Sequence, residues 1–486
     1  MASSMFAQTA INQHRGDLPM AIGELSAQRV ASDWAARLQL APPPAAPESV
    51  AQTGLNEVVI ADLLLKHLLQ QGVLSGYELA RAMCLPFSVI EPLLEWLKHD
   101  RYVEVTGGEM LGPISYRFAL TDLGRQRARE AMDACQYVGP TPVTLLQYAE
   151  QMQRQSVRGI PCTEQEIRRA TAHLLLPDEL FDGLGPAVVS GHSILLYGPP
   201  GSGKSAVSRA LGEFLNRRGG LIWVPYAIYE AGSIITLYDP LLHTQLSERE
   251  SGADPELLAV EQYGVEPDPR WVCVYRPVVS VGGELTLAML DLSYNATGNY
   301  YQPPIQLKAN GGLLVIDDFG RQVVSPQALL NRWILPLEER YDYLTLANGK
   351  KIRIPFEQLV IFSTNLDPND LADEAFLRRI RYKLSFRAPS RAEYEQIFRL
   401  TAERLGLEFE EGVFDHLFAE FYVRGKRPRG SDPRDLLEIA TAICRFRGIE
   451  PPRVTVALIH EAASRFFSNE VPPAEEGAEK AGTAQA

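Results

Sequence analysis

Three short runs of apolar residues predict buried β-strands in the middle of the chain, at 192–197, 313–316 and 358–365. Each run gives way at once to polar or glycine-rich residues. Unbroken apolar runs of this length are typical of strands covered on both faces, as in a parallel sheet. Residues 204–215 have the spacing of an amphipathic helix directly after the first run. The pattern therefore predicts an α/β fold that contains a strand–loop–helix unit.

A second pattern predicts a separate α+β domain at residues 55–135. Three stretches have helical spacing. The first is 56–72, the second begins with a capping box of Ser75 and Glu78, and the third is the first part of 86–105, which then runs into a strand. A turn, a second strand and a helix that begins near Thr121 follow. Three helices, a two-stranded wing and a further helix resemble a winged-helix domain. The pattern Y-x-F-x-L-T-x-x-G at 116–124 is similar to the second wing strand of that family.

Charge favours a protein partner over DNA for this predicted domain. Residues 55–135 contain eight Lys and Arg against eleven Asp and Glu, a net charge of −3. The helix in the DNA-reading position offers Glu91, Glu95 and Asp100 against Lys98, and only the start of the last helix is locally basic. An acidic face repels phosphates, so DNA binding remains the less favoured alternative.

The remaining segments differ in composition. Residues 41–50 form a Pro/Ala-rich stretch, and the tail is acidic and rich in small residues. The expected organisation is a flexible N-terminal segment with a Pro-rich linker, a winged-helix-like domain, a linker helix, a core, a helical lid and a disordered tail, at 1–54, 55–135, 136–164, 165–387, 388–469 and 470–486.

Composition points to a soluble cytoplasmic protein. The formal net charge is −13, which disfavours general nucleic-acid binding. The five cysteines are scattered and form no CxxC pair, which suits reduced thiols. The first 20 residues lack the apolar stretch of a signal peptide, and no apolar run approaches the roughly 20 residues that a membrane span needs.

The loop after the first apolar run carries the clearest chemistry. Its sequence, GPPGSGKS, fits G-x-x-x-x-G-K-[ST] from Gly198 to Ser205. Glycines allow successive backbone N–H groups to face one phosphate, and a helix N-terminus adds its positive dipole. Lys204 would reach the terminal phosphates of ATP, and the Ser205 hydroxyl would hold Mg²⁺. The predicted ATP-binding residues are Gly198, Pro199, Pro200, Gly201, Ser202, Gly203, Lys204, Ser205 and Ala206.

Polar residues also follow the other two apolar runs. Asp317 and Asp318 emerge at the carboxyl end of the second run, where ligands bind in open α/β sheets. Asp317 would anchor the magnesium shell, and Asp318 would polarise the attacking water. Asn365 ends the third run and could position that water. A pair of acids that merely caps a turn, or an asparagine in an ordinary turn, is the plainer alternative.

A dense group of arginines comes next, at Arg378, Arg379 and Arg381. An arginine finger stabilises transition-state charge and is often supplied by a neighbouring molecule. A solvated run of charge is the alternative. Arg434 lies near the start of a later predicted helix.

These motifs, in this order, resemble the AAA+ ATPases over residues 165–466. The resemblance implies a P-loop NTPase fold with a parallel sheet, helices on both faces and a helical lid. It further implies Walker A at 198–205, Walker B at 313–318, sensor 1 at Asn365, an arginine finger at Arg378 or Arg379, and sensor 2 at Arg434. The A-N-G-G run before Walker B and the Q-x-L-L pattern after it are similar to the MoxR and magnesium-chelatase group and to bacterial enhancer-binding activators. A β-hairpin on Asn348-Gly349, expected from the turn residues, also occurs there.

Two features depart from the family pattern. Asp318 stands where AAA+ proteins usually have glutamate, so its carboxylate is one methylene shorter. Tyr226, Tyr229 and Tyr238, after the strand expected to follow the P-loop helix, form no clean pore-loop triplet, and a core role is the plainer reading.

The favoured function is a ring-forming AAA+ ATPase that remodels a protein partner, with the winged helix as adaptor. The alternatives are a DNA-associated regulator and a slowly hydrolysing nucleotide switch.

Overall fold

The computed structural model describes residues 40–108, 112–246, 254–371, 377–423, 426–449 and 453–467. The predicted N-terminal segment before residue 40 and the predicted tail from residue 470 lie outside these residues. The chain divides into two compact units, and it crosses between them several times. The first unit comprises the residues up to Arg154, Gly220–Ile234 and Tyr238–Tyr275, and the second comprises Gln155–Gly219, Ile235–Leu237 and the residues from Arg276 onward.

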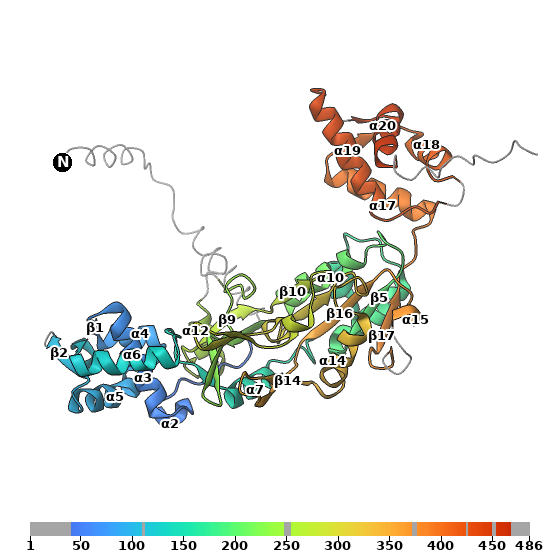
Figure 1. Cartoon of the computed structure of the whole chain (residues 1–486). Coiled ribbons are helices and arrows are strands. Elements are labelled where there is room, and N and C mark those ends of the chain that lie inside the picture. The colour runs from blue at the N-terminus through green and yellow to red at the C-terminus, as the bar shows by residue number, and fades with distance from the viewer. Residues whose placement is uncertain are drawn as a thin grey trace, which may run out of the picture. The chain divides into compact units, whose positions relative to one another are not determined.

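A five-stranded parallel sheet forms the centre of the second unit (Figure 1). The three apolar runs are its three inner strands, which confirms the predicted fold class. In spatial order the strands are β10 (Val278–Val281), β13 (Leu313–Ile316), β16 (Leu359–Thr364), β5 (Ile194–Tyr197) and β17 (Tyr382–Ser385).

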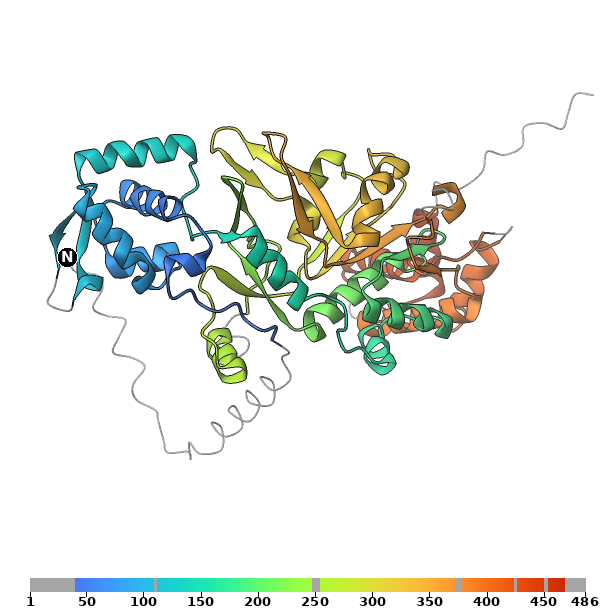
Figure 2. The same cartoon turned by 90° about the horizontal axis from the view of Figure 1, so that it is seen from below.

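Helices cover both faces of this sheet. Successive side chains of a strand point to opposite faces. On β16, Leu359 and Ile361 join a core cluster with residues of α9 (Asp178–Ser190) and α10 (Lys204–Arg218). Phe362 contacts Trp333 of α14 (Pro326–Glu339), with ring centroids 6.1 Å apart. Accordingly, α9 and α10 lie on one side of the strands and α14 on the other (Figure 2).

Smaller elements surround the sheet. The hairpin predicted at Asn348-Gly349 is confirmed: β14 (Tyr341–Thr345) and β15 (Lys351–Pro355) pair antiparallel, and Gly349 takes a φ of 81°. The segment between β10 and β13 contains η2 (Leu287–Leu290), β11 (Ser293–Asn295), β12 (Tyr300–Gln302) and α13 (Ile305–Lys308). Helix α8 (Glu164–Ala170) packs beside α10, and α15 (Pro368–Leu371) follows β16.

The carboxyl-terminal part of the second unit is helical, as predicted for a lid. Its core is rich in aromatic residues, among them Tyr394, Phe398 and Phe414. A short parallel pair, β18 (Glu408–Phe409) and β19 (Arg453–Val454), accompanies the helices. The helices are α17 (Arg391–Arg404), α18 (Val413–Glu420), α19 (Asp432–Phe446) and α20 (Val456–Phe466).

In the first unit, residues 55–135 form the predicted order of elements around their own apolar core. Ser75 and Glu78 form the predicted capping box, and Thr121 caps the last helix. The strands form one antiparallel sheet in the order β1-β3-β2. The elements are α3 (Glu57–Gln71), β1 (Leu74–Ser75), α4 (Gly76–Met83), α5 (Phe87–His99), β2 (Val103–Gly107), η1 (Pro113–Ser115), β3 (Arg117–Leu120) and α6 (Asp122–Ala134). The winged-helix assignment itself stays a prediction.

The strand after α10 does not join the parallel sheet. Instead, β6 (Leu221–Pro225) pairs antiparallel with β9 (Trp271–Tyr275) inside the first unit. The same unit contains β4 (Val143–Thr144), α7 (Leu145–Arg154), β7 (Ala227–Glu230) and α12 (Pro255–Tyr263), while β8 (Ser233–Thr236) spans a crossing. Residues 220–275 therefore interrupt the range predicted as one core, and α7 occupies part of the predicted linker helix.

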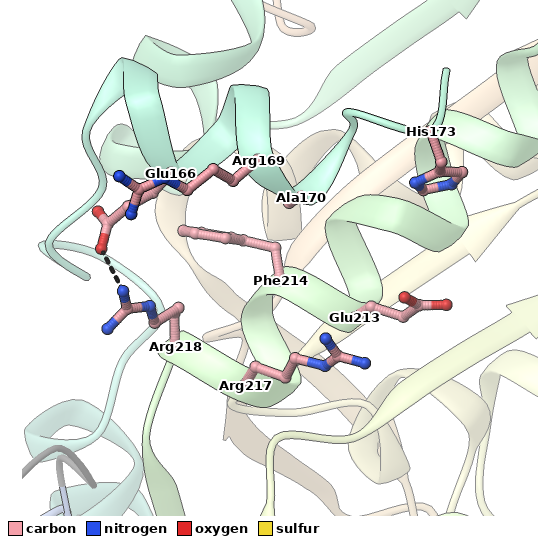
Figure 3. Close-up of a pocket in the computed structure, with 8 residues that line it drawn as sticks. All are labelled: Glu166, Arg169, Ala170, His173, Glu213, Phe214, Arg217 and Arg218. Atoms are coloured by element: carbon pink, nitrogen blue, oxygen red, sulfur yellow. Dashed lines mark ion pairs between the residues drawn. The ribbon is translucent and has the colours of Figure 1, made fainter. Parts of the chain in front are cut away.

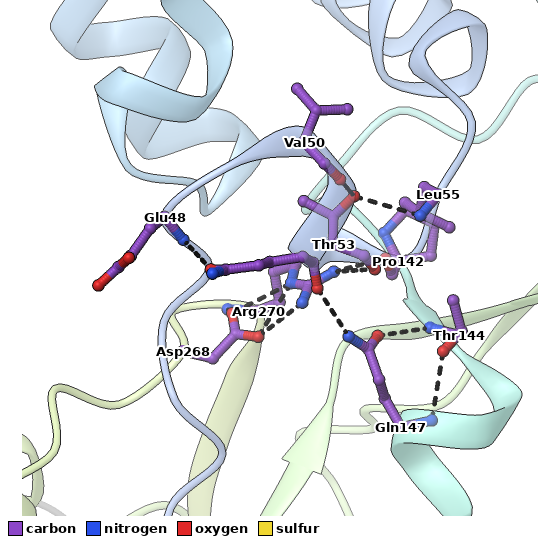
Figure 4. Close-up of polar contacts among 10 residues, drawn as sticks. Glu48, Val50, Thr53, Leu55, Pro142, Thr144, Gln147, Asp268 and Arg270 are labelled. Atoms are coloured by element: carbon purple, nitrogen blue, oxygen red, sulfur yellow. Dashed lines mark hydrogen bonds and ion pairs between the residues drawn. The ribbon is translucent and has the colours of Figure 1, made fainter.

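Residues 40–54, predicted as a flexible linker, are held in the first unit. Prolines donate no backbone hydrogen bond, but the carbonyl of Pro44 accepts one from Asp268 at 2.8 Å. Arg270 forms a buried ion pair with Asp268 and holds the end of this segment in place (Figure 4). Arg270 Nη1 donates to the carbonyl oxygens of Thr53 and Pro142, each at 3.3 Å. Thr53 ends the short helix α2 (Val50–Thr53).

No helix in the described residues is long and apolar enough to cross a membrane.

Candidate nucleotide site

The loop between β5 and α10 is packed so closely that glycine is required at two positions. Gly198 has a φ of 142°, and a Cβ there would lie 2.1 Å from the carbonyl oxygen of Phe386. Gly201 has a φ of 74°, and a Cβ there would lie 2.7 Å from Ser431 Oγ. L-residues with side chains rarely adopt such φ values. The loop is thus pressed against the end of β17 on one side and the start of α19 on the other.

Lys204 is only 5% exposed, and its ammonium group is surrounded by oxygen atoms. It donates to the carbonyls of Gly198 and Pro199 at 2.9 Å each, to Ser202 Oγ at 3.4 Å and to Asn365 Oδ1 at 2.8 Å. Burial lowers the pKa of Lys204, and the nearby charges of Asp317 and Asp318 oppose that shift. The one lysine of the loop is therefore held by oxygen atoms of the loop itself and of Asn365.

Asp317 and Ser205 are brought together from the ends of β13 and the start of α10. Ser205 Oγ donates to Asp317 Oδ2 at 2.9 Å. The backbone N–H of Asp317 donates to the carbonyl of Val281, which fixes the residue to the neighbouring strand. A hydroxyl and a carboxylate oxygen at this separation are the hard ligands that Mg²⁺ prefers.

Asp318 is exposed and has a φ of 48°, in the left-handed region. Asn365 Nδ2 donates to its Oδ1 at 3.1 Å, while Asn365 Oδ1 accepts from Lys204. The N–H of Phe319 donates to the carbonyl of Ser363 at 2.7 Å, which ties the turn to β16. An aspartate in this conformation costs about 1 kcal/mol or more, which the surrounding contacts must offset. Side chains that follow the ends of β13 and β16 thus meet beside the P-loop lysine.

Two of the predicted arginines lie at the opposite end of the sheet. The P-loop follows the carboxyl end of β5, whereas Arg378 and Arg379 precede the amino end of β17, which runs parallel to β5. Arg379 Nε forms an ion pair with Glu338 of α14 at 2.8 Å, and Arg378 is exposed. The structure therefore does not bring either arginine to the P-loop of its own chain.

Arg434 lies closer, on the first turn of α19. This helix begins at the P-loop, because the N–H of Ser431 donates to the carbonyl of Gly201 at 3.1 Å. The Arg434 side chain itself is 65% exposed and pairs with Asp435 and Glu438 of its own helix. In both pairs the arginine is largely exposed, and such pairs hold a side chain only weakly.

Some contacts of the site have no signal in the sequence. Gln322 Nε2 donates to the Asp317 carbonyl, and its Oε1 accepts from the N–H of Gly320, each at 2.8 Å. The approach of Phe386 to Gly198 joins residues far apart in the chain. Neither glutamine nor phenylalanine at these positions forms a motif, so only the folded chain shows them.

A separate cavity of about 310 Å³ lies between α8 and α10, away from the P-loop end of α10 (Figure 3). Arg217 and Arg218 occupy the last turn of α10, and Arg169 the last turn of α8. Cations complement the negative end of a helix dipole, which accounts for this cluster without a ligand. Glu166 pairs with Arg218 at 3.2 Å.

Two of the tyrosines considered for a pore loop, Tyr226 and Tyr238, contact each other. The rings of Tyr226 and Tyr238 meet edge to face at 5.4 Å, and Tyr238 stacks on His243. Burial raises the pKa of Tyr226 and of Tyr229. Their surroundings favour the core role.

Comparisons with known proteins cover parts of the chain. A family model described as a domain of unknown function, DUF8689, matches residues 390–465. This range contains α17, α18, α19 and α20. The vesicular-fusion protein sec18 of Schizosaccharomyces pombe is 38% identical over 80 residues, 16% of this chain and 10% of that protein. The vesicle-fusing ATPase of Caenorhabditis elegans is 40% identical over 67 residues, 14% of this chain and 8% of that protein. The chain spans a tenth or less of these relatives.

Solved structures give only distant likenesses. NtrX from Brucella abortus in complex with ADP has a TM-score of 0.37 at 14% identity, over 64% of this chain and 60% of that one. A RuvB mutant from Thermotoga maritima has a TM-score of 0.32 at 11% identity, over 63% and 71%. Scores this low carry no argument, so the fold assignment rests on the strand order and loop geometry of this chain.

Proposed function

We propose that the protein is an AAA+ ATPase, which binds and hydrolyses ATP. One observation carries the proposal: Lys204, Asp317, Asp318 and Asn365 meet at the carboxyl ends of neighbouring parallel strands, around a glycine loop that begins a helix. Phosphates bind in such loops through backbone N–H groups and the helix dipole. The short matches to two vesicle-fusion proteins, one of them named as an ATPase, agree with this function.

Ser205 and Asp317 would hold Mg²⁺, since their oxygens already lie 2.9 Å apart. A bound Mg²⁺ neutralises phosphate charge. Asp318 would accept a proton from the attacking water, because its carboxylate is exposed and fixed on one side by Asn365. Asn365 would orient that water and hold Asp318 in place. Arg434 would reach the terminal phosphate only after leaving its two carboxylate partners.

We further propose that the active form is an oligomeric ring. The arginines at the amino end of β17 are separated from their own P-loop by the length of the strand, so they would serve the P-loop of a neighbouring subunit. Of the two, Arg378 is the better finger, because Arg379 is already paired with Glu338. A finger supplied in trans makes hydrolysis a property of the assembly.

The partner of residues 55–135, taken as a winged-helix-like adaptor, would be a protein that the ring remodels. The exposed side of α5 carries Glu95 and the 44% exposed Trp96. At the basic start of α6, Arg125 pairs with Asp122 and Arg127 with Asp62, each at 2.8 Å, so two of its positive charges already have acidic partners. These pairs weigh against the DNA-associated alternative. The free cysteines of the described residues suit a cytoplasmic protein.

The slow nucleotide switch is the second candidate, favoured by the shorter carboxylate of Asp318. Its discriminating measurement is the turnover number of the assembled protein.

Replacing Lys204 by alanine tests the nucleotide site. Lys204→Ala should weaken ATP binding at least tenfold, because a buried charge-assisted contact to phosphate is lost. The affinity is measured by titration calorimetry in Mg²⁺. Lys351→Ala, an exposed lysine on β15, is the matched control. Equal ATP affinity in the parent and Lys204→Ala would overturn the site assignment.

A further inference from the structure

The most exposed large apolar side chain in the described part of the molecule lies on the helical lid. Phe446, the last residue of α19, is 92% exposed, and Ile449 beyond it is 49% exposed. Arg445 and Arg447 are its neighbours in the sequence. A fully exposed phenylalanine between two arginines has the composition of an interface anchor, because aromatic residues and arginine are enriched where proteins meet.

The second unit also contains an apolar pocket of about 530 Å³, between α8 and α9. Ile167 and Phe181 are buried beneath it, and Val189 is 40% exposed. Two carboxylates, Glu164 and Asp182, stand among the lining residues. The remaining lining residues are Cys162, Gly185, Pro186 and Ser190.

The charges around the two features are complementary. Arg445 has no ion pair with any other residue that the structure describes, and the same holds for Asp182 within those residues. Arg447 pairs with Glu461 at 2.7 Å, and Glu164 pairs with Arg168 at 2.8 Å. The Arg168 guanidinium also lies over the ring of Phe181. An aromatic side chain with basic flanks thus matches an apolar pocket that has acidic residues in its lining.

We propose that Phe446 of one copy of this chain docks in the α8–α9 pocket of the next copy. This inference rests on the proposed function, in that it supplies a contact for the proposed ring. A projection and a pocket at different places on one chain make a heterologous contact, which repeats from copy to copy and closes into a ring when the rotation allows. A symmetric two-fold dimer would instead place the same surface on both sides.

The projection is tested by Phe446→Ser in the full chain. Sedimentation velocity with Mg·ATP gives the dissociation constant of the assembly for the parent and the variant. Loss of one fully buried aromatic contact should raise that constant about 10- to 100-fold. Leu241→Ser is the matched control, because Leu241 is 91% exposed but lies on the first unit. If Phe446→Ser assembles like the parent, the inference is wrong.

The pocket is tested by filling it. A Cβ at Gly185 would meet no atom within 4 Å, so Gly185→Trp can place its ring in the pocket without a backbone clash. It should weaken assembly as strongly as Phe446→Ser while the thermal unfolding midpoint stays near that of the parent. A folded Gly185→Trp protein that assembles normally would contradict the proposal.

A charge exchange tests whether the two features meet. Arg445→Glu and Asp182→Arg should each weaken assembly, and the double variant should recover it, because the pair is restored with reversed signs. Failure of the double variant to recover would overturn the pairing. ATP affinity is measured in parallel and separates this inference from the proposed function. If every variant binds ATP and assembles like the parent, the docking proposal is wrong and the proposed function is unaffected. If the parent chain binds no ATP and stays monomeric, both the docking proposal and the proposed function are wrong.

Discussion

The two aspartates at the carboxyl end of the parallel sheet and Arg276 at its amino end are held in opposite ways. At the carboxyl end, Asp317 and Asp318 are partly or fully exposed and are bonded to side chains, Ser205 and Asn365. At the amino end, Arg276 is 5% exposed and is bonded to backbone carbonyls. An exposed aspartate can exchange its side-chain partner for a ligand. Buried backbone carbonyls have no access to water, so they depend on Arg276 for their hydrogen bonds.

Arg276 binds three backbone segments at the amino end of the sheet. Its guanidinium donates to the carbonyls of Gly219, Gln155 and Gly311 at 2.5, 2.8 and 2.5 Å. Burial lowers the pKa of Arg276 to about 10, so the group stays protonated at neutral pH. Gln155, Gly219 and Arg276 are also residues at which the chain passes between the two units. Arg276 thus ties together three segments at the amino end of the sheet.

The largest expected effect concerns the arginines at the amino end of the sheet. If they acted on a nucleotide bound to the same chain, the difference between the two ends of the sheet would not hold. Arg378→Ala should lower ATP turnover of the assembled protein about 10³- to 10⁵-fold, as the loss of a finger does. Arg379→Ala should cost far less, because its pair with Glu338 is structural. Steady-state phosphate release is the measurement.

Mixing separates action in trans from action in cis. Arg378→Ala has an intact P-loop and Lys204→Ala has an intact Arg378. If Arg378 acts across subunits, the mixture should regain activity that neither variant has alone. A mixture that co-sediments and stays inactive would show that Arg378 does not act across subunits.

A second prediction sharpens the role of the carboxyl end. Asp318→Asn keeps the shape of the side chain and removes the proposed base, so ATP binding should persist while turnover falls about 10²- to 10⁴-fold. Asp317→Asn is the contrasting variant, in which the Mg²⁺ concentration at half-maximal rate should rise. Binding is followed by calorimetry and turnover by phosphate release. Turnover by Asp318→Asn at the parent rate would favour another base.

The sequence predicts the inner strands better than the edges of this sheet. Strands β5, β13 and β16 are covered on both faces, so their apolar runs are unbroken. Edge strands are half exposed: in β10 only alternate residues are buried, and in β17 only Leu384 is. Strand β6 is buried throughout and reads like an inner strand, yet it pairs in the other unit. An apolar run reports burial and not the sheet to which a strand belongs.

The same limit applies to the site. Residues that follow apolar runs, such as Lys204 and Asp317, could be predicted, because parallel strands end at one edge. The contacts from Phe386 and Ser431 to the P-loop could not, since they depend on how β17 and α19 return to it.

A third prediction tests the buried end directly. Arg276→Met keeps most of the side-chain volume but leaves three carbonyls without their charged donor. Each unsatisfied buried carbonyl costs roughly 1–3 kcal/mol, so the three together should lower the free energy of unfolding by about 3–9 kcal/mol. Urea unfolding measures the change, and Arg209→Met, an exposed arginine of α10, is the control. An unfolding curve like that of the parent would mean that Arg276 holds nothing together.

The smallest expected effect concerns a charged pair at the carboxyl end of the sheet whose role is structural. It shows that not every charged residue at this end belongs to the proposed nucleotide site. Glu393, in the first turn of α17, accepts from both terminal nitrogens of Arg387, at 2.7 and 2.6 Å, and from the N–H of Ser390 at 2.7 Å. The Arg387 hydrogen bonds, foremost, hold the pKa of Glu393 at about 2, below its usual 4.5. The folded state therefore favours the ionised form.

The stabilisation from Glu393 should be complete above about pH 4.5 and lost as the pH falls towards 2, because protonation removes the acceptor. Glu393→Gln should cost about 1 kcal/mol at pH 7, a typical value for a capping contact on a partly exposed helix start. Urea unfolding at pH 7 and pH 3 measures the difference from the parent, which should shrink at pH 3. Glu395→Gln, whose partner Arg391 lies four residues away on the same helix, is the control. A cost that is the same at both pH values would show that the charge of Glu393 contributes nothing, and that the capping geometry alone supports the helix.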